Sequence, residues 1–202
     1  MSQIIPTYVY TEMTPNPASL KFVADRMLIE HGELAEYQNI DDAQGSSELA
    51  VKLFQFPFVK AVFVMSNFVT VSKTPDLDWN DIKDELRTFI QKDLMGSQLA
   101  VQKVPAKGNS SKNNEKEEID FSSVPSEFDE KIQSILEEYV RPAVERDGGA
   151  IDYKSFVNGT VTVVLKGSCS GCPSSTVTLK NGVESLLQSM IPQVREVVAF
   201  EM

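Results

Sequence analysis

The chain has 202 residues, of which 42% are hydrophobic and 24% are charged, as in ordinary globular proteins. Its formal net charge is −10, and its 19 Lys and Arg are scattered among 29 Asp and Glu without the basic stripe of a nucleic-acid binder. No apolar run reaches the roughly 18 to 20 residues of a membrane-spanning helix, and two cysteines are too few for a disulfide framework.

The first part of the chain predicts an α+β domain over residues 1–96. Thr14-Pro-Asn-Pro17 indicates a turn, because both prolines fix φ and disfavour helix. Ser46 or Ser47 is expected to cap a short helix, and Asp76 or Asp78 a longer one that carries an apolar stripe from Trp79 to Ile90. In chain order we expect strands at 7–13 and 19–24, a helix at 47–54, a hairpin of 60–65 and 68–72, and a helix at 79–90.

A flexible linker is predicted over residues 97–124. Its centre, 107–118, contains no aliphatic or aromatic side chain. Such a segment cannot bury enough apolar surface to offset the entropy lost on ordering. We therefore expect two small domains of helices packed on sheets, joined by this tether.

The second domain, 125–202, predicts the order α-β-β-α-β, a sheet with its helices on one side. Pro142 should bend or loosen the last turn of the first helix, and Asp147-Gly148-Gly149 should end it. Asn158-Gly159 is a strong hairpin signal. The expected elements are a helix at 128–144 capped by Ser126, strands at 151–157 and 160–166, a helix at 174–190 and a strand at 194–201.

The first residues, Met1 to Thr7, have no basic flank, apolar segment or Arg/Ser-rich amphipathic character. They resemble neither a secretory signal nor a transit peptide. We therefore expect a cytoplasmic protein, most simply a bacterial one. In a reducing cytoplasm a pair of cysteines is catalytic, redox-active or metal-binding more often than it is a disulfide.

Cys169 and Cys172 lie between the end of a predicted strand and the start of a predicted helix. Gly167 and Gly171 allow the backbone to turn tightly there. A helix N-terminus offers unpaired N–H groups and a partial positive charge, and both favour the thiolate, which is the form that binds metal. We therefore expect ionised thiols at this position.

The residues alone leave three interpretations of this pair open. It is a pair of incidental buried cysteines, the dithiol of a thioredoxin-like oxidoreductase, or part of a metal site. The thioredoxin fold needs a βαβ unit before the motif, whereas a hairpin precedes it here. A zinc or iron–sulfur site ordinarily needs four ligands. The chain offers two thiols and one distant His31, expected at the surface, so a complete site requires a second copy across a symmetric dimer.

Beyond this pair, longer motifs carry a resemblance to a known family. The C-terminal part resembles the NifU C-terminal (Nfu) domain, and the N-terminal part resembles the Nfu N-terminal domain, with departures at Glu48 and at Phe58-Val59. The C-terminal motifs are Leu136–Pro142, Asp147-Gly148-Gly149, Gly167-x-Cys169-x-x-Cys172-Pro-Ser-Ser175 and Thr178–Glu184, and the N-terminal motifs are Thr14–Phe22, Leu49-Ala50, Leu53-Phe54, Asn67–Lys73 and Trp79.

The resemblance implies an iron–sulfur cluster carrier or scaffold rather than an enzyme. Such a carrier receives a 4Fe-4S cluster from an upstream scaffold and transfers it to apo iron–sulfur proteins. The cluster is bridged across a homodimer, with Cys169 and Cys172 as each chain's ligands, and neither nucleic acid nor membrane is an expected partner. The alternative function is a thioredoxin-like thiol–disulfide oxidoreductase that uses the same pair, and a zinc-bridged structural dimer is the third.

Two other features have a functional interpretation beside a structural one. Ser168, Ser170, Ser174 and Ser175 can donate hydrogen bonds to cluster sulfurs, or they serve only as loop and cap residues. Thr14-Pro-Asn-Pro17 is either a recognition loop or a rigid turn.

Overall fold

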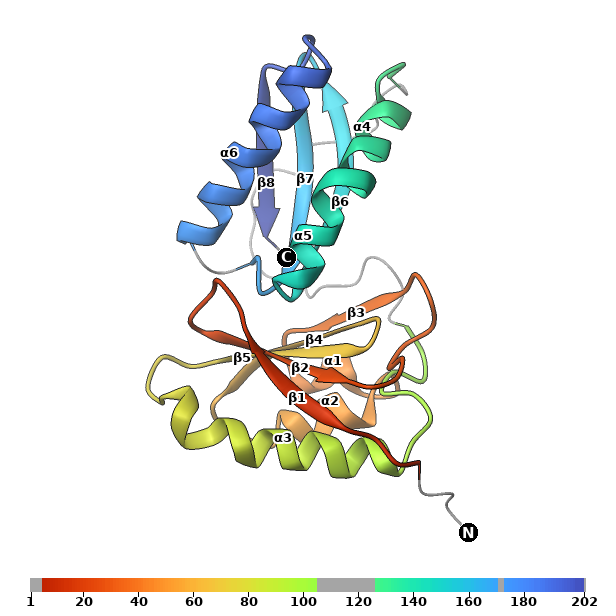
Figure 1. Cartoon of the computed structure of the whole chain (residues 1–202), viewed down its shortest axis with the longest axis vertical. Coiled ribbons are helices and arrows are strands. Elements are labelled where there is room, and N and C mark those ends of the chain that lie inside the picture. The colour runs from red at the N-terminus through yellow and green to blue at the C-terminus, as the bar shows by residue number, and fades with distance from the viewer. Residues whose placement is uncertain (1–4, 105–125, 171–172, 202) are drawn as a thin grey trace. The chain divides into compact units, whose positions relative to one another are not determined.

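The computed structural model describes residues 5–104, 126–170 and 173–201, with the side chains of 173–175 and 201 left out (Figure 1). The chain divides into two compact units, residues 1–110 and 111–202. Both units combine helices with strands, so the predicted α+β class is confirmed. In the described part of the chain, no helix is both long and apolar enough to cross a bilayer.

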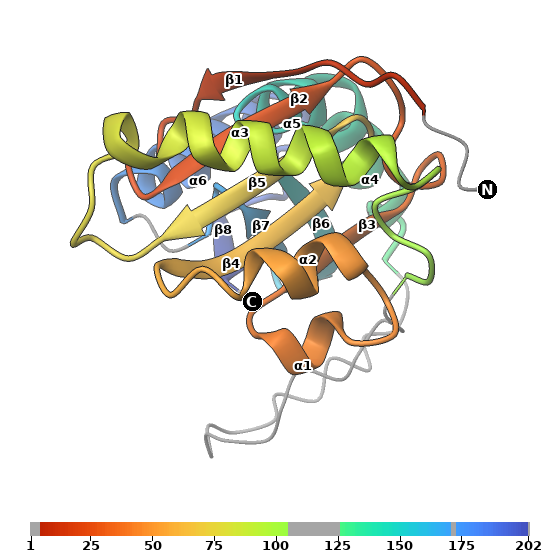
Figure 2. The same cartoon turned by 90° about the horizontal axis from the view of Figure 1, so that it is seen from below.

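The first unit is a five-stranded antiparallel sheet in the order β1-β2-β5-β4-β3. All three helices lie on one face of this sheet (Figure 2). They cover Phe22 and Val71 with Leu53 and Leu86, among other residues of one hydrophobic core. The elements are β1 (Val9–Met13), β2 (Ser19–Ala24), β3 (Leu34–Tyr37), α1 (Ile40–Ala43), α2 (Glu48–Leu53), β4 (Val59–Met65), β5 (Phe68–Lys73) and α3 (Trp79–Met95).

The predicted caps of this unit are present. The side chain of Ser47 accepts from the backbone N–H of Ala50 and begins α2, and Asp78 accepts from Asn80 and begins α3. Trp79 is buried in the core, as its position on the apolar stripe predicted. The strand β3 and the helix α1 were not predicted, because each has only 4 residues and neither shows a clear period.

The start of the predicted linker differs from the prediction. Residues 97–104, called the strap here, lie against the first unit, and Ala100 and Val101 are buried in its core. The N–H of Ala100 donates to Leu28 O at 2.7 Å, and the hydroxyl of Ser47 donates to Ala100 O at 2.6 Å. The strap therefore belongs to the first unit, while residues 105–124 of the predicted linker lie outside the described residues.

The second unit has the predicted order α-β-β-α-β. Its sheet has the order β6-β7-β8, with β6 and β7 antiparallel and β7 and β8 parallel. Asn158 and Gly159, at φ of 50° and 87°, form the predicted turn between β6 and β7. The elements are α4 (Asp129–Ile135), η1 (Leu136–Val140), α5 (Arg141–Arg146), β6 (Gly149–Val157), β7 (Thr160–Gly167), α6 (Pro173–Met190) and β8 (Glu196–Glu201).

The long first helix of this unit contains a π-helical turn, η1, immediately before Pro142. The backbone N–H of Arg141 donates to Leu136 O, five residues back, and Pro142 has no N–H to donate. The loosened turn that Pro142 predicted is therefore present in this form. The predicted cap is wrong, because the N-cap of α4 is Phe128, which makes no side-chain cap bond. Ser126 lies two residues earlier, where its Oγ accepts from the N–H of Phe128 at 3.2 Å and its N–H donates to Asp129 at 2.9 Å.

Candidate functional site

Two loops of the second unit meet around Cys169. One is the turn Asp147-Gly148-Gly149, which joins α5 to β6, and the other follows the end of β7 at Gly167. Gly149 and Gly167 are partners in the β6–β7 ladder, and the N–H of Ser168 donates to Gly148 O at 3.2 Å. The antiparallel hairpin thus brings together two motifs that are far apart in the sequence.

The backbone at both loops requires glycine. Gly148 has a φ of +82° and Gly167 a φ of +65°, in the left-handed region that other L-residues rarely adopt. The tight turn predicted for Gly167 is therefore present. Gly171, the other predicted turn residue, and Cys172 lie outside the described residues.

The thiol of Cys169 faces the interior of the second unit. The residue is 7% exposed and belongs to the same hydrophobic cluster as Ile132, Leu165 and Val183. Gly149 lies directly beside it: a Cβ added to Gly149 would be 2.7 Å from Cys169 Sγ and 2.6 Å from Lys166 O. The space occupied by the thiol therefore exists because residue 149 has no side chain.

The serines of the loop bind backbone carbonyl groups. Ser168 Oγ donates to Asp147 O and lies 3.9 Å from Cys169 Sγ, and Ser170 Oγ donates to Gly167 O at 2.9 Å. These hydroxyls hold the loop in shape, which is the structural interpretation from the sequence. The side chains of Ser174 and Ser175 are not among those described.

The electrostatics of Cys169 differ from the prediction. The pKa of the Cys169 thiol is raised to about 11. Burial is the main cause, the hydrogen bond with Ser168 opposes the rise, and the negative charge of Asp147 adds to it. The expectation of an ionised thiol is wrong for this residue, because loss of hydration in an apolar cluster outweighs the field of the helix N-terminus. At neutral pH the thiol of Cys169 is protonated.

This shift predicts a pH dependence of stability. The folded state favours the protonated thiol, so its contribution is complete below about pH 9, the ordinary thiol value, and is lost as the pH rises to about 11. The loss is about 2 to 3 kcal/mol, at about 1.4 kcal/mol per pKa unit. Urea unfolding of the Cys172→Ser protein at pH 7 and pH 11 should show it, relative to a Cys169→Ser/Cys172→Ser control. An equal pH dependence in both proteins would contradict the buried thiol.

Thiolates are soft ligands suited to iron–sulfur clusters and to zinc, so the chemistry of Cys169 fits either group once its proton is lost. No group of three or more Asp, Glu, His or Cys residues able to hold a metal ion occurs among the described residues. His31 is exposed in the first unit, as expected. The described residues therefore provide one soft ligand and not a complete site.

The polar groups of the loop Thr14-Pro-Asn-Pro17 form hydrogen bonds within the first unit. Thr14 Oγ1 donates to Ser19 O at 3.1 Å, and Asn16 Oδ1 accepts from the N–H of Ala18 at 2.9 Å. The indole N–H of Trp79 donates to Pro17 O at 3.0 Å. The rigid-turn interpretation accounts for these residues without a recognition role.

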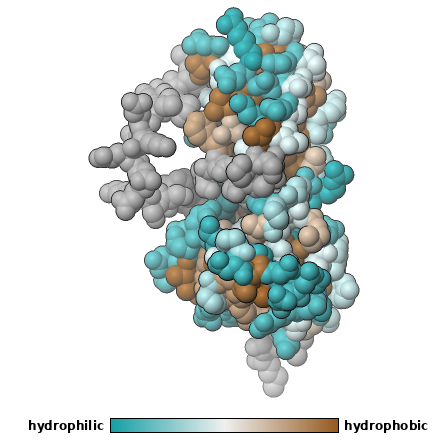
Figure 3. Space-filling model, turned by 90° about the vertical axis from the view of Figure 1, so that its left-hand side faces the viewer, coloured by the Kyte–Doolittle hydropathy of each residue, from teal (hydrophilic) through white to brown (hydrophobic). Residues whose placement is uncertain are grey.

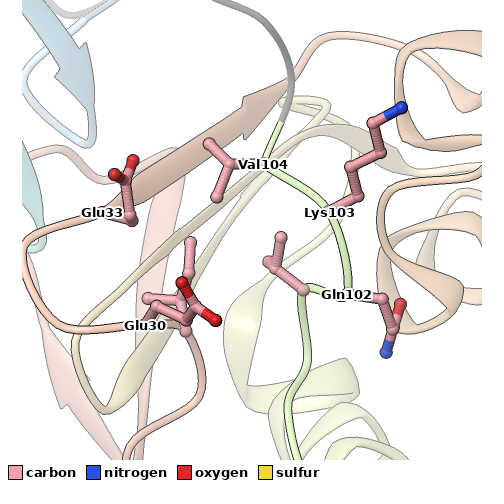
Figure 4. A pocket seen from close by; sticks show the side chains of 7 residues that line it. Glu30, Glu33, Gln102, Lys103 and Val104 are labelled. Atoms are coloured by element: carbon pink, nitrogen blue, oxygen red, sulfur yellow. The ribbon is translucent and has the colours of Figure 1, made fainter.

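The first unit also has a pocket of about 350 Å³ between residues 29–33, which precede β3, and the strap (Figure 4). In Figure 4 the Lys103 side chain extends away from Glu30 and Glu33. The lining contains neither thiol nor imidazole, so the pocket lacks soft metal ligands. The lining residues are Ile29, Glu30, Glu33, Val101, Gln102, Lys103 and Val104.

On the side shown in Figure 3, the surface gives no stronger candidate for a binding site than the cysteine loop. There the hydrophobic residues are scattered among hydrophilic ones over the visible described surface of each unit.

Sequence reasoning located the cysteine pair, but it interpreted Asp147-Gly148-Gly149 mainly as a helix stop. The contact of Gly149 and Asp147 with the cysteine loop had no local signal.

Both units match known families. "Scaffold protein Nfu/NifU N terminal" matches residues 9–97, and "NifU-like domain" matches residues 132–198. The human protein "NFU1 iron-sulfur cluster scaffold homolog, mitochondrial" is 35% identical over 195 residues, which cover 94% of this chain and 70% of that protein. A Drosophila willistoni protein of the same name is 37% identical over 190 residues, with 94% and 62% covered.

Two further similarities concern a plant protein and a solved structure. "NifU-like protein 4, mitochondrial" of Arabidopsis thaliana is 36% identical over 195 residues, which cover 94% of this chain and 65% of that protein. The chain thus spans less than two thirds of the Drosophila and Arabidopsis proteins. The solution structure of a NifU-like protein from Saccharomyces cerevisiae is 29% identical, with a TM-score of 0.44, over 50% of this chain and 87% of that one.

The names of these relatives correct one prediction. All three curated proteins are mitochondrial, so the expectation of a cytoplasmic protein is wrong. That expectation depended on the residues with which the sequence begins, and these do not determine the compartment.

Proposed function

Because this chain belongs to the Nfu/NifU family, whose curated members include iron–sulfur cluster scaffold proteins, we propose that it is an iron–sulfur cluster carrier. Its cargo is a 4Fe-4S cluster that it accepts from an upstream scaffold and transfers to apo iron–sulfur proteins. Cys169 and Cys172 are the ligands from each chain. The role is binding and transfer, with no enzymatic reaction.

The observation that carries this proposal is the setting of Cys169. Its loop joins a strand to a helix and lies against a glycine turn, and both loops belong to the region that matches the NifU-like domain. A 4Fe-4S cluster is ordinarily held by four thiolates, and the chain has two cysteines. Two copies related by a two-fold axis supply four, so the loaded protein is a homodimer with the cluster between its subunits.

We further propose a division of labour between the units. The second unit, from about residue 125, holds the cluster, and the first unit contributes to recognition of the donor or recipient protein. The linker is assigned to residues 105–124, which shortens the 97–124 expected from the sequence by the strap.

Anaerobic reconstitution with ferrous iron and sulfide tests the proposal. We expect a broad absorbance at about 400 nm and about four irons per dimer. Cys169→Ser should lose both while it keeps the fold, and Ser170→Ala, in the same loop, should keep both. Sedimentation should show a dimer only when the protein is loaded, and the loaded protein should activate an apo 4Fe-4S enzyme in the presence of an iron chelator.

Three results would replace this proposal with another. A protein that stays colourless while it catalyses dithiol exchange is the thioredoxin-like oxidoreductase. Stoichiometric zinc in anaerobically purified protein indicates the zinc-bridged structural dimer. A loaded protein that sediments as a monomer rules out the shared cluster.

A further inference from the structure

The Cys169 thiol lies in the wrong place for a cluster that two subunits share. Such a cluster lies between two surfaces, whereas Cys169 is 7% exposed and packs within the hydrophobic cluster of its own unit. Gly149 covers the sulfur on one side, since its added Cβ would be 2.7 Å from Sγ. The structure therefore shows the ligand in a closed position, from which it cannot reach a second chain.

The hydrogen bonds of the cysteine loop divide into two kinds. Ser170 Oγ and the Ser170 N–H both donate to Gly167 O, at 2.9 and 3.2 Å, so these bonds stay within the loop. Ser168 instead reaches across to the other loop: its Oγ donates to Asp147 O and its N–H donates to Gly148 O at 3.2 Å. Only the second kind opposes separation of the two loops.

Ser168 itself is 1% exposed, so its hydroxyl is bound in a site that water does not reach freely. A hydrogen bond in such a place costs more to lose than one at the surface. The left-handed glycines Gly148 and Gly167 lie at the base of the two loops, where a change of backbone direction has the smallest steric cost.

We propose that Ser168 is a positioning residue that latches Cys169 in its closed, core-facing position, and that cluster loading requires this latch to release. The purpose of the latch rests on the proposed function, but the closed position is a property of the cluster-free protein. On release the thiol reaches water, its proton passes to the solvent, and the sulfur is free to bond to iron. While closed, the latch keeps the empty ligand away from oxidants.

The test measures how fast Cys169 is alkylated in the cluster-free protein. A Cys172→Ser background leaves Cys169 as the single thiol. Iodoacetamide labelling, followed by mass spectrometry, is compared in the native protein and in concentrated guanidinium chloride. We expect strong protection of the native thiol, and in Ser168→Ala an alkylation rate about 3 to 10 times higher, as expected for loss of one buried hydrogen bond.

Two variants and one measurement separate a latch from general destabilisation. Ser170→Ala removes a hydroxyl of the same type from the same loop and should leave the alkylation rate of Cys169 unchanged. Ser168→Thr keeps the hydroxyl and should restore protection. The alkylation rate is also measured at several urea concentrations below the unfolding transition, where a local release depends only weakly on urea and global unfolding depends steeply on it.

Three results would overturn the proposal. The first is a native thiol that reacts as fast as in denaturant, and the second is a Ser168→Ala rate equal to that of the parent. The third is an alkylation rate that rises with urea as steeply as global unfolding does, because the thiol is then exposed only when the whole second unit unfolds.

A second readout concerns loading. With both cysteines present, Ser168→Ala should take up iron and sulfide faster and reach the same final iron content. Slower loading, or unchanged loading, contradicts the need for release. If no protein, including the parent, binds a cluster, the proposed function fails, while the alkylation rates still decide whether Ser168 is a latch.

Discussion

Replacing Gly149 with alanine is expected to destabilise the second unit by about 2 to 3 kcal/mol and to displace Cys169 from its buried position. The new methyl group would lie 2.6 Å from Lys166 O and 2.7 Å from Cys169 Sγ. The first neighbour is backbone in the β6–β7 ladder and cannot rotate away. Relief must therefore come from separation of the turn and the cysteine loop, which exposes the thiol.

Urea unfolding followed by far-ultraviolet circular dichroism, together with alkylation of Cys169, measures both effects. Trp79 is the only tryptophan and lies in the first unit, so its fluorescence reports whether the change is confined to the second. Gly182→Ala is the matched control. Gly182 lies within α6, and its added Cβ meets no heavy atom within 4 Å apart from its chain neighbours and the backbone of its own helix, so alanine there should stabilise by about 1 kcal/mol. Wild-type stability in Gly149→Ala would show that the loops separate without cost.

Replacing Val101 with aspartate is expected to lower the stability of the first unit by about 3 kcal/mol or more. Val101 is 3% exposed and belongs to the main core of that unit. A carboxylate there loses its hydration in the core of the unit. The strap would detach, together with the hydrogen bonds that Ala100 makes with Leu28 and Ser47.

Trp79 fluorescence during urea unfolding gives this change directly. The control is Gln98→Asp, which places the same charge on an exposed residue of the strap and should change the stability by less than about 0.5 kcal/mol. Equal stability of the two variants would mean that the strap does not contribute to the core and that the first unit ends near residue 96.

The strap shows where reasoning from sequence stops. Its residues between 97 and 104 form no helix or strand, so neither a helical nor a strand period marks them as ordered. They are held by hydrogen bonds with residues that are remote in the sequence, namely Arg26, Leu28, Ser46 and Ser47. Trp79, by contrast, was predicted to be buried because it begins a helical stripe, and stripes are local patterns.

The cysteine loop also has one feature that the sequence predicts and one that it does not. Gly167 was expected in a tight turn because the requirement belongs to the residue itself, and the structure has it at a φ of +65°. The protonation state of Cys169 was predicted incorrectly, because it depends on how much of the thiol the rest of the fold covers. A helix N-terminus can be inferred from the sequence, but the extent to which a side chain is buried in the core cannot.

The sequence by itself determined the two α+β units, the α-β-β-α-β order of the second unit, the family resemblance, and the number of thiols available per chain. These follow from local periodicity, turn residues and counting. Only the tertiary structure decided that Cys169 faces the core, that Gly149 leaves room for its sulfur, and that Ser168 joins the two loops. Those features depend on the β6–β7 register, which places residues about twenty positions apart in contact, and no local pattern encodes such a distance.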